Sequence, residues 1–430
     1  MLSKRLKLCV AVAMLLASGF IACSEDEEPK HDKTENQQNQ VSPDNQSGNQ
    51  SDNQSNNNPQ SQPCKLGEAT TPTEVRDAMG MGWNLGNQFD AYDNGVSSET
   101  AWSQPICTQQ TFNKVAAAGI KTVRIPVTWM GHIGEAPDYT IDDAWLNRIY
   151  EVVGYAEKAG LNAIINIHHD GSNAQYWLNI KECANNLQKQ TETIAKLSAI
   201  WKQIATKFAD KGHFLVFEAF NEIQDGGWGW GDNRNDGGRQ YNAMNEWLKA
   251  IVETIRTTGG NNATRWIGVP AYNTDIDLIE HLVLPDDPAK RLMVSIHYYA
   301  PYEYTLENQY QQWGHDAELS KTTNYGQESY CQEQMQKLND RYISKGIPVY
   351  IGEMGNINRG DATAEKFRAY YFEFVAKCMH DNGIPAILWD NGVANSGREC
   401  HGYFNHSTGE WMNDNSEQMI KTLVKAMSNN

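Results

Sequence analysis

Two short apolar stretches of the chain each carry a carboxylate where a buried strand is expected to end. Residues 217–222 (FEAFNE) end on Asn221 and Glu222, and residues 349–353 (VYIGE) end on Glu353. Because burying a charge is costly, a carboxylate at such a position favours a chemical role. Two carboxylates that flank one bond can act as general acid and as nucleophile or base, which is what hydrolysis of a glycosidic bond requires.

Short β-like runs alternate with helical segments from about residue 80 onward. There are eight runs, at residues 80–86, 122–127, 163–168, 215–221, 265–269, 293–297, 349–353 and 386–389. Apolar residues recur at helical spacing between them, over 109–118, 143–158, 191–208, 243–256, 332–343 and 364–379. Repeated strand and helix units form a parallel sheet, and eight of them close a barrel. The pattern predicts an α/β fold, a (β/α)8 TIM barrel, in a single domain over residues 64–430.

Polar residues gather where these strands are expected to end, and the carboxyl ends of barrel strands face the active site. One buried arginine or histidine has an ordinary structural explanation, but six or more on one rim would each cost free energy without a function. We therefore predict one polar site, built from Asn87, Arg124, His168, His169, Asn221, Glu222, His297, Tyr299, Glu353 and Trp389.

The charges in this site lead to an expectation about its two glutamates. Arg124 near Glu353 would keep that carboxylate ionised, while burial and the neighbouring negative charge would raise the pKa of Glu222. A retaining reaction needs carboxyl groups about 5–5.5 Å apart, a separation that opposing strand ends of a narrow barrel can supply.

Composition narrows the classes of partner. The net charge is −17 and no basic cluster is interleaved with aromatic residues, so we expect no nucleic-acid partner. No Cys-x-x-Cys pair indicates zinc, and His168 and His169, adjacent on a strand, are expected to point to opposite faces. We therefore expect neither a metal nor a cofactor. Six cysteines beyond residue 63 permit disulfides without defining their pairing.

The first 63 residues are not expected to belong to the barrel. Residues 1–22 resemble a signal peptide, with Lys4, Arg5 and Lys7 before an uncharged run over 8–21 that is too short to span a membrane. Residues 20–23 (FIAC) resemble the lipobox of bacterial lipoproteins, which implies lipidation of Cys23. Residues 31–63 are almost all Asn, Gln, Ser, Asp and Pro, the composition of a disordered tether.

These features predict an exported bacterial lipoprotein with a disordered linker over 23–63, held to the membrane by its lipid alone. The acidic residues 24–28 resemble a tag that directs some Gram-negative lipoproteins to the outer face, although a solvated charge run looks the same. We expect the protein at the outer membrane, exposed to the cell surface and monomeric.

Six motifs resemble signatures of glycoside hydrolase family 5, the large cellulase family, and occur in its order. They are residues 82–87 (GWNLGN), 123–129 (VRIPVTW), 165–169 (INIHH), 217–222 (FEAFNE), 297–299 (HYY) and 352–355 (GEMG). The resemblance implies that Glu222 is the general acid/base and Glu353 the nucleophile of a retaining mechanism. It also implies that Arg124 and Asn221 orient the carboxylates, that His168, His297 and Tyr299 complete the network, and that Trp389 stacks under the sugar.

Two further pairs of residues concern specificity. Trp228 and Trp230 lie in a glycine-rich loop after Glu222, where exposed indoles favour a sugar platform, whereas the other tryptophans at helical spacing are expected in the core. Gln88 and Phe89 depart from the family's first motif and are expected to reshape a subsite.

The leading interpretation is endo-acting hydrolysis of a β-1,4-glucan, because residues 84–87 (NLGN) resemble the family's endoglucanases. Xyloglucan, mixed-linkage glucan and mannan stay open as substrates. A surface glycan-binding protein without turnover is the alternative of another class, and the intact Glu222 and Glu353 pair argues against it. An amidase or a metal hydrolase is not favoured, because the sequence contains neither a nucleophile elbow nor a cluster of metal ligands.

Overall fold

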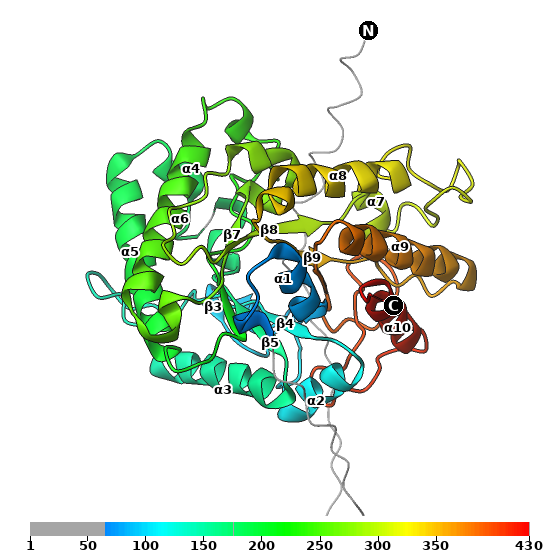
Figure 1. The fold of residues 1–430 in the computed structure, drawn as a ribbon, viewed down its shortest axis with the longest axis horizontal. Helices are drawn as coiled ribbons and strands as arrows, with labels where there is room; N and C mark the ends of the chain where they lie inside the picture. Colours follow the sequence, from blue (N-terminus) through cyan, green and yellow to red (C-terminus); the bar gives the residue numbers. More distant parts are fainter. Residues whose placement is uncertain (1–64, 175, 430) are drawn as a thin grey trace, which may run out of the picture. The chain divides into compact units, whose positions relative to one another are not determined.

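The computed structural model describes residues 65–174 and 176–429, and they form a closed parallel barrel (Figure 1). The predicted signal peptide, Cys23 and the linker lie outside these residues. Each neighbouring pair of strands is parallel, and β1 closes the ring by pairing with both β4 and β10. In ring order the strands are β1 (Met81–Asn84), β10 (Ala386–Leu388), β9 (Val349–Met354), β8 (Leu292–Tyr298), β7 (Ile267–Pro270), β6 (Leu215–Glu218), β5 (Asn162–Ile165) and β4 (Thr122–Ile125). The predicted (β/α)8 barrel is confirmed.

Amphipathic helices cover the outside of the barrel and bury their apolar faces against it. The α-helices beyond the first are α2 (Gln109–Ala117), α3 (Asp143–Ala159), α4 (Ile180–Cys183), α5 (Leu187–Lys207), α6 (Arg239–Thr257), α7 (Tyr302–Thr305), α8 (Glu328–Arg341), α9 (Ala362–Asp381) and α10 (Ser416–Ala426). In α3, the Asp142 side chain accepts hydrogen bonds from the first-turn N–H groups, and Gly160 ends the helix in the left-handed conformation at φ 74°. Trp145, Trp201 and Trp247 are buried core residues, as predicted.

Short 3-10 helices and one hairpin complete the described elements. The 3-10 helices are η1 (Lys65–Gly67), η2 (His169–Ala174), η3 (Asp232–Arg234), η4 (Gly260–Ala263), η5 (Tyr272–Thr274), η6 (Ile276–His281) and η7 (Ile343–Lys345), and the hairpin pairs β2 (Tyr92–Asp93) with β3 (Val96–Ser97). Within residues 65–174 and 176–429, no helix has the length and apolar character needed to cross a membrane.

Helix α1 (Pro72–Met79) covers the N-terminal end of the barrel, over the centre of the ring in Figure 1. Thr71 and Glu74 form a capping box at its start, and Pro72 occupies the first turn. Val75 and Met79 pack with inward-facing strand residues in a second buried cluster. Among the described residues, side chains thus fill this end of the barrel, and the polar residues predicted for the site lie at the opposite, C-terminal end.

Five strands end one to three residues earlier than the sequence predicts, namely β1, β4, β5, β6 and β10, and the difference is largest for β5 and β6. Strand β6 pairs with β7 only through Phe217 and Glu218, and the chain continues as an extended segment whose Asn221 N–H donates to the Ile167 carbonyl. Strand β5 ends at Ile165. His168, Asn221 and Glu222 therefore lie beyond their strands, on segments that rise from the barrel rim.

The cysteines that the structure describes are free thiols, namely Cys107, Cys183, Cys331, Cys378 and Cys400, while Cys64 lies outside the described residues.

Candidate active site

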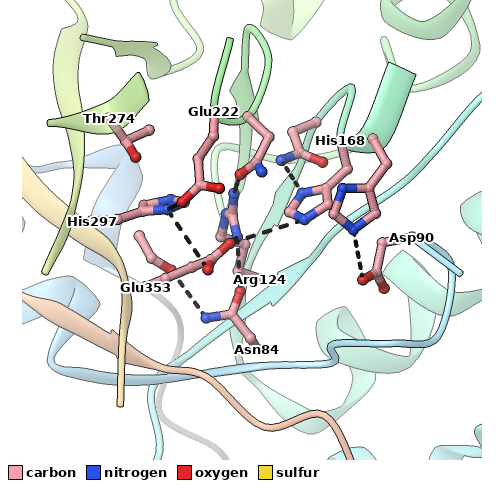
Figure 2. A network of polar contacts seen from close by, with 12 residues as sticks. Asn84, Asp90, Arg124, His168, Glu222, Thr274, His297 and Glu353 are labelled. Carbon is pink, nitrogen blue, oxygen red and sulfur yellow. Dashed lines mark hydrogen bonds and ion pairs between the residues drawn. The ribbon is translucent and has the colours of Figure 1, made fainter. Parts of the chain in front are cut away.

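Arg124 lies at the centre of the polar network, fully buried on β4 (Figure 2). Its Nε donates to Glu218 Oε2 at 2.9 Å, and its Nη2 donates to Asn221 Oδ1 at 2.8 Å and lies 2.8 Å from Glu218 Oε2. Its Nη1 donates to Asn84 Oδ1 at 3.0 Å and to Glu353 Oε1 at 2.8 Å. These contacts use all five N–H groups of the guanidinium, so its position and orientation are fixed.

Glu222 and Glu353 face each other across His297. The Nδ1 atom of His297 lies 2.6 Å from Glu222 Oε1 and 3.6 Å from Glu353 Oε2. One carboxylate oxygen of Glu222 and one of Glu353 lie within 4.8 Å of each other. Glu353 also accepts a hydrogen bond from the Tyr299 hydroxyl at 3.1 Å. Arg124 on β4, His297 on β8 and Tyr299 just beyond β8 thus hold the pair together.

Burial and hydrogen bonding set the two pKa values in the opposite order to our expectation. Burial raises the pKa of Glu353 even though His297 and Arg124 oppose it. Burial would also raise the pKa of Glu222, but the hydrogen bond from His297 outweighs it and lowers that pKa. The expectation that Glu222 has the raised pKa is therefore wrong for the substrate-free chain, because the sequence did not show that His297 contacts Glu222.

His168 carries a defined proton. The side-chain oxygen of Asn166 accepts from the Val127 N–H, so the Asn166 amide nitrogen must be the atom 3.1 Å from His168 Nδ1. That nitrogen donates to Nδ1, which leaves the proton of neutral His168 on Nε2, 4.0 Å from Glu353 Oε1. Burial, with the nearby His169 and Arg124, holds the pKa of His168 well below its usual range. His168 therefore offers Glu353 a neutral N–H group.

Trp389 forms a flat wall beside this network. Its ring is parallel to the His168 ring, with centroids 6.2 Å apart, and it follows β10 directly. Gly86 explains the close approach of the first motif: a Cβ there would lie 2.7 Å from Trp389 Cη2 and 2.8 Å from the Asp390 carbonyl oxygen. A larger residue at position 86 would displace the indole.

Comparison with known proteins agrees with this geometry. Residues 86–395 match the model of the cellulase family, glycosyl hydrolase family 5. The chain belongs to this family. It is 37% identical over 341 residues to endoglucanase A of Paenibacillus barcinonensis, covering 75% of this chain and 83% of that one.

Two solved structures of family 5 resemble the barrel closely. A GH5-4 broad specificity endoglucanase from Bacteroides salanitronis is 52% identical with a TM-score of 0.82, and the match covers 84% of this chain and 96% of that one. A Bacteroidetes-affiliated GH5 cellulase linked with a polysaccharide utilization locus is 44% identical with a TM-score of 0.81, over 85% of this chain and 95% of the other. This member of family 5 is a glycosidase.

His169 differs from its predicted placement. It begins η2 beyond the end of β5, so it does not alternate with His168 on a strand, and the two rings lie 4.4 Å apart. His168 and His169 therefore do not point to opposite faces of a strand, and that expectation is wrong. His169 Nε2 lies 3.7 Å from Asp90 Oδ2, and Asp90 also accepts the backbone N–H of Asn87. These contacts fix the loop after β1 against the loop after β5.

The tryptophans of the glycine-rich loop are exposed in this family 5 chain, as predicted. Trp228 is 53% exposed and Trp230 73% exposed. The guanidinium carbon of Arg234 lies 4.5 Å from the Trp230 ring centroid, and the Asp225 carboxylate accepts N–H groups on both sides of the turn. The loop is therefore held in shape by polar contacts while its indoles face solvent.

Gln88 and Phe89 do not line a subsite, so that expectation is wrong. Both are fully buried. The Gln88 amide nitrogen donates to the backbone carbonyls of Glu99 and Pro105, and the Phe89 ring packs against Trp145 at 5.7 Å. These buried residues anchor the loop after β1 to the residues that pack beneath it.

Three polar residues beneath the family 5 network were not among the predicted site residues, namely Asn84, Asn166 and Glu218. Asn84 and Glu218 contact Arg124 directly, and Asn166 donates to Glu218. Glu218 was visible as a lone charge inside the apolar run 215–220, a signal we passed over in favour of the run's last residue.

An aromatic surface around His169 was also missed. Trp102, which is 37% exposed, packs against Tyr92 at 5.4 Å and against His169 at 5.7 Å. Tyr176 packs against Tyr92 at 5.7 Å, and their hydroxyls are hydrogen bonded. Only the tertiary fold brings these rings together, because they come from two separate loops.

Proposed function

We propose that this glycosidase cleaves β-1,4-glucan chains internally and with retention of configuration, with Glu353 as nucleophile and Glu222 as general acid/base. The observation that carries the proposal is the close approach of the pair, since one carboxylate oxygen of each lies within 4.8 Å of the other. Retaining glycosidases hold their carboxyl groups about 5–5.5 Å apart, whereas inverting enzymes leave about 6.5–9.5 Å for a water molecule. The close approach of the pair supports the retaining arrangement over the inverting one.

In the first step, Glu353 attacks the anomeric carbon, the bond to the leaving sugar breaks, and Glu222 gives its proton to the leaving oxygen. Arg124 and Tyr299 donate hydrogen bonds to Glu353 and stabilise its ionised form. His297 Nδ1 lies between the two carboxylates and is the route by which a proton reaches Glu222. The step requires a protonated Glu222 and an ionised Glu353, which is the opposite of their pKa order in the substrate-free chain.

In the second step, water attacks the glycosyl ester, the ester bond to Glu353 breaks, and Glu222 accepts the proton of the water. Esterification has removed the negative charge of Glu353, so the charge repulsion that favours a protonated Glu222 is gone. The same two side chains therefore serve both steps with exchanged roles.

Trp389 supports the sugar at the point of cleavage, and the exposed rings of two loops receive the rest of the chain. Trp228 and Trp230 form one platform, and Trp102 with Tyr92 forms another. Stacking on indoles tolerates different decorations of the glucan backbone. A related structure is described as a broad specificity endoglucanase, which supports testing xyloglucan, mixed-linkage glucan and mannan as further substrates.

Two measurements test this function. Proton NMR of the first product should show the β-anomer, because two inversions give retention, and an α-anomer would overturn the roles of Glu222 and Glu353. Product profiles on carboxymethyl cellulose, xyloglucan, mixed-linkage glucan and mannan should show mixed oligosaccharides from early times if cleavage is internal. Release of a single short product from each would contradict endo action.

We propose further that the protein is exported and anchored through lipid on Cys23, with residues 23–63 as a tether at the outer face of the outer membrane. The support is in the sequence: a signal-like segment, a lipobox-like FIAC at residues 20–23 and the polar tract that follows. Cys23→Ser should move the enzyme from the membrane to the soluble fraction with its specific activity unchanged. A mutant that stays with membranes would refute the anchor.

A further inference from the structure

Glu218 is a fully buried carboxylate beneath the catalytic pair, and the mechanism above does not use it. Its Oε2 accepts from Arg124 and, at 2.8 Å, from Asn166. Its Oε1 accepts from the hydroxyls of Ser295 and Tyr350, each at 2.7 Å. Donors from β4, β8, β9 and the segment after β5 therefore occupy the lone-pair positions of one carboxylate on β6.

These contacts keep Glu218 ionised in the middle of the barrel. Burial opposes ionisation, but the charge of Arg124 and the hydroxyl donors outweigh it and lower the pKa of Glu218. Arg124 thus lies between two carboxylates, with Glu218 on its Nε side and Glu353 on its Nη1 side. Of these two, only Glu353 changes its charge during the proposed reaction.

That asymmetry matters when the covalent intermediate forms. Esterification neutralises Glu353, while Arg124 stays fully buried and positively charged. A buried cation without a counterion is strongly unfavourable. Glu218 does not react, so it can neutralise Arg124 in the free enzyme and in the intermediate alike.

We propose that Glu218 is a positioning residue that serves as the permanent counterion of Arg124, fixing the guanidinium against Glu353 and lowering the free energy of the glycosyl-enzyme intermediate. The inference rests on the proposed function, in which Glu353 is the nucleophile. Glu218 itself does not touch the sugar.

The proposal makes a specific statement about pH. Removing the charge of Glu218 leaves the full field of Arg124 on Glu353, so Glu353 should ionise at lower pH and should be a weaker nucleophile. The other charged or titratable groups that act on Glu353 are unchanged by the substitution, and they are His168, Glu222, His297, Tyr299 and Glu399.

The test is Glu218→Gln, compared with Glu218→Asp and Ser295→Ala. The amide keeps the shape of the side chain, and the Ser295 and Tyr350 hydroxyls can turn to accept its N–H groups. The readout is the rate at which a 2-deoxy-2-fluoro-β-cellobioside with a good leaving group labels the enzyme, measured against pH, with the labelled residue located by mass spectrometry. Labelling reports the first chemical step alone.

We expect Glu218→Gln to slow labelling by about 10- to 100-fold and to move the acidic limb of its pH profile down by about one unit, with little change in the inhibitor concentration for half-maximal rate. Glu218→Asp keeps the charge but shifts its position, so labelling should slow while the acidic limb stays. Ser295→Ala should leave the acidic limb of the labelling profile at its wild-type pH.

An unchanged acidic limb in a folded Glu218→Gln enzyme would overturn the proposal, as would equal shifts in Glu218→Gln and Glu218→Asp. If Glu218→Gln does not fold, Glu218→Asp decides alone, because labelling at the wild-type rate would refute a positioning role. A failure of the proposed function looks different, since wild-type enzyme would then carry no label on Glu353.

Discussion

The two ends of the barrel each bury an arginine completely, but they neutralise it in different ways. At the C-terminal end, Arg124 contacts the carboxylates of Glu218 and Glu353. At the N-terminal end, Arg265 precedes β7 and donates to the backbone carbonyls of Phe208, Lys211, Gly212 and Leu215 and to the Asn262 side chain.

The difference appears in the electrostatics. Burial and the nearby Arg256 lower the pKa of Arg265 to about 10. Burial acts on Arg124 in the same direction, but Glu218 and Glu353 outweigh it and raise its pKa. Arg265 donates hydrogen bonds to backbone carbonyls at its end of the barrel. Arg124 instead holds carboxylates, one of which changes its charge during the proposed reaction. One end of the barrel is therefore arranged for stability and the other for chemistry.

The largest effect should come from removing the nucleophile at the catalytic end. Glu353→Ala should lower kcat by about 10³-fold or more, because no covalent intermediate can form. Azide should partly restore turnover by entering the vacated space and should give an inverted product, detected by NMR. Near-normal activity of the variant would refute the assignment.

The acid/base variant supplies the contrast for that experiment. In Glu222→Ala the intermediate should still form from substrates with good leaving groups but should break down slowly. We expect a burst of leaving group, and azide should yield a product of retained configuration. The basic limb of the pH profile should also disappear, because it reports the proton on Glu222.

The second prediction exchanges each buried arginine for lysine. Arg124→Lys keeps the charge but loses the fork of five donors, so kcat should fall by about 100-fold through misplacement of Glu353. Arg265→Lys should instead lower the free energy of unfolding by about 2–4 kcal/mol, because several buried carbonyls lose their donor. Activity assays and denaturant unfolding of both variants measure the two effects.

If Arg265→Lys lost as much activity as Arg124→Lys at temperatures where both variants are folded, the two arginines would not have different roles. If Arg124→Lys unfolded at nearly the wild-type denaturant concentration, Arg124 would contribute mainly to activity and little to stability.

A third prediction concerns the pH dependence of stability. Asp170 lies beyond β5 at the catalytic end, and burial raises its pKa to about 6. The raised value means that its contribution is fully present below the unfolded pKa of about 4 and is lost as pH rises through 6, by about 3 kcal/mol in total. Asp170→Asn should therefore reduce the loss of thermal stability between pH 4 and pH 7.

Asp287 at the other end is the matched control. Burial opposes ionisation there, but the hydrogen bonds from Arg256 lower its pKa. Its contribution is present above the unfolded pKa and is lost as pH falls, so Asp287→Asn should destabilise the protein more at pH 7 than at pH 3. Equal pH slopes for the two variants would contradict this contrast between the ends.

The smallest effects should come from the exposed indoles. Trp228→Ala and Trp230→Ala should raise KM for long oligosaccharides several-fold and leave short ones nearly unchanged, because each ring adds one remote contact. Thermal stability should not change, since both rings face solvent. A uniform loss across chain lengths would count against the platform.

The barrel and its catalytic end were predictable because each strand is a short apolar run and most runs are followed by a polar residue. Glu222, Glu353 and Arg124 were found from this pattern. The contact between His297 and Glu222 was not, since it joins β8 to the segment beyond β6, 75 residues away in the sequence, and depends on where β6 stops pairing.

Other errors share one cause. Gln88 and Phe89 looked like surface features of a motif but are buried under it, and the His168–His169 pair was placed on a strand that ends before it. Periodicity gives the approximate extent of a strand, whereas its last paired residue depends on neighbouring strands that are distant in sequence.

The five donors of Arg124 also link the active site to the order in which the chain folds. They join β4 to Asn84 on β1, to Glu218 on β6 and to Glu353, which is 229 residues away in the sequence. Such long-range contacts form late in folding because a large loop must close first. A chain that has been synthesised only as far as β8 contains Arg124, Glu222 and His297 but no nucleophile. Recovery of activity during refolding should therefore follow closure of the barrel and should never precede it.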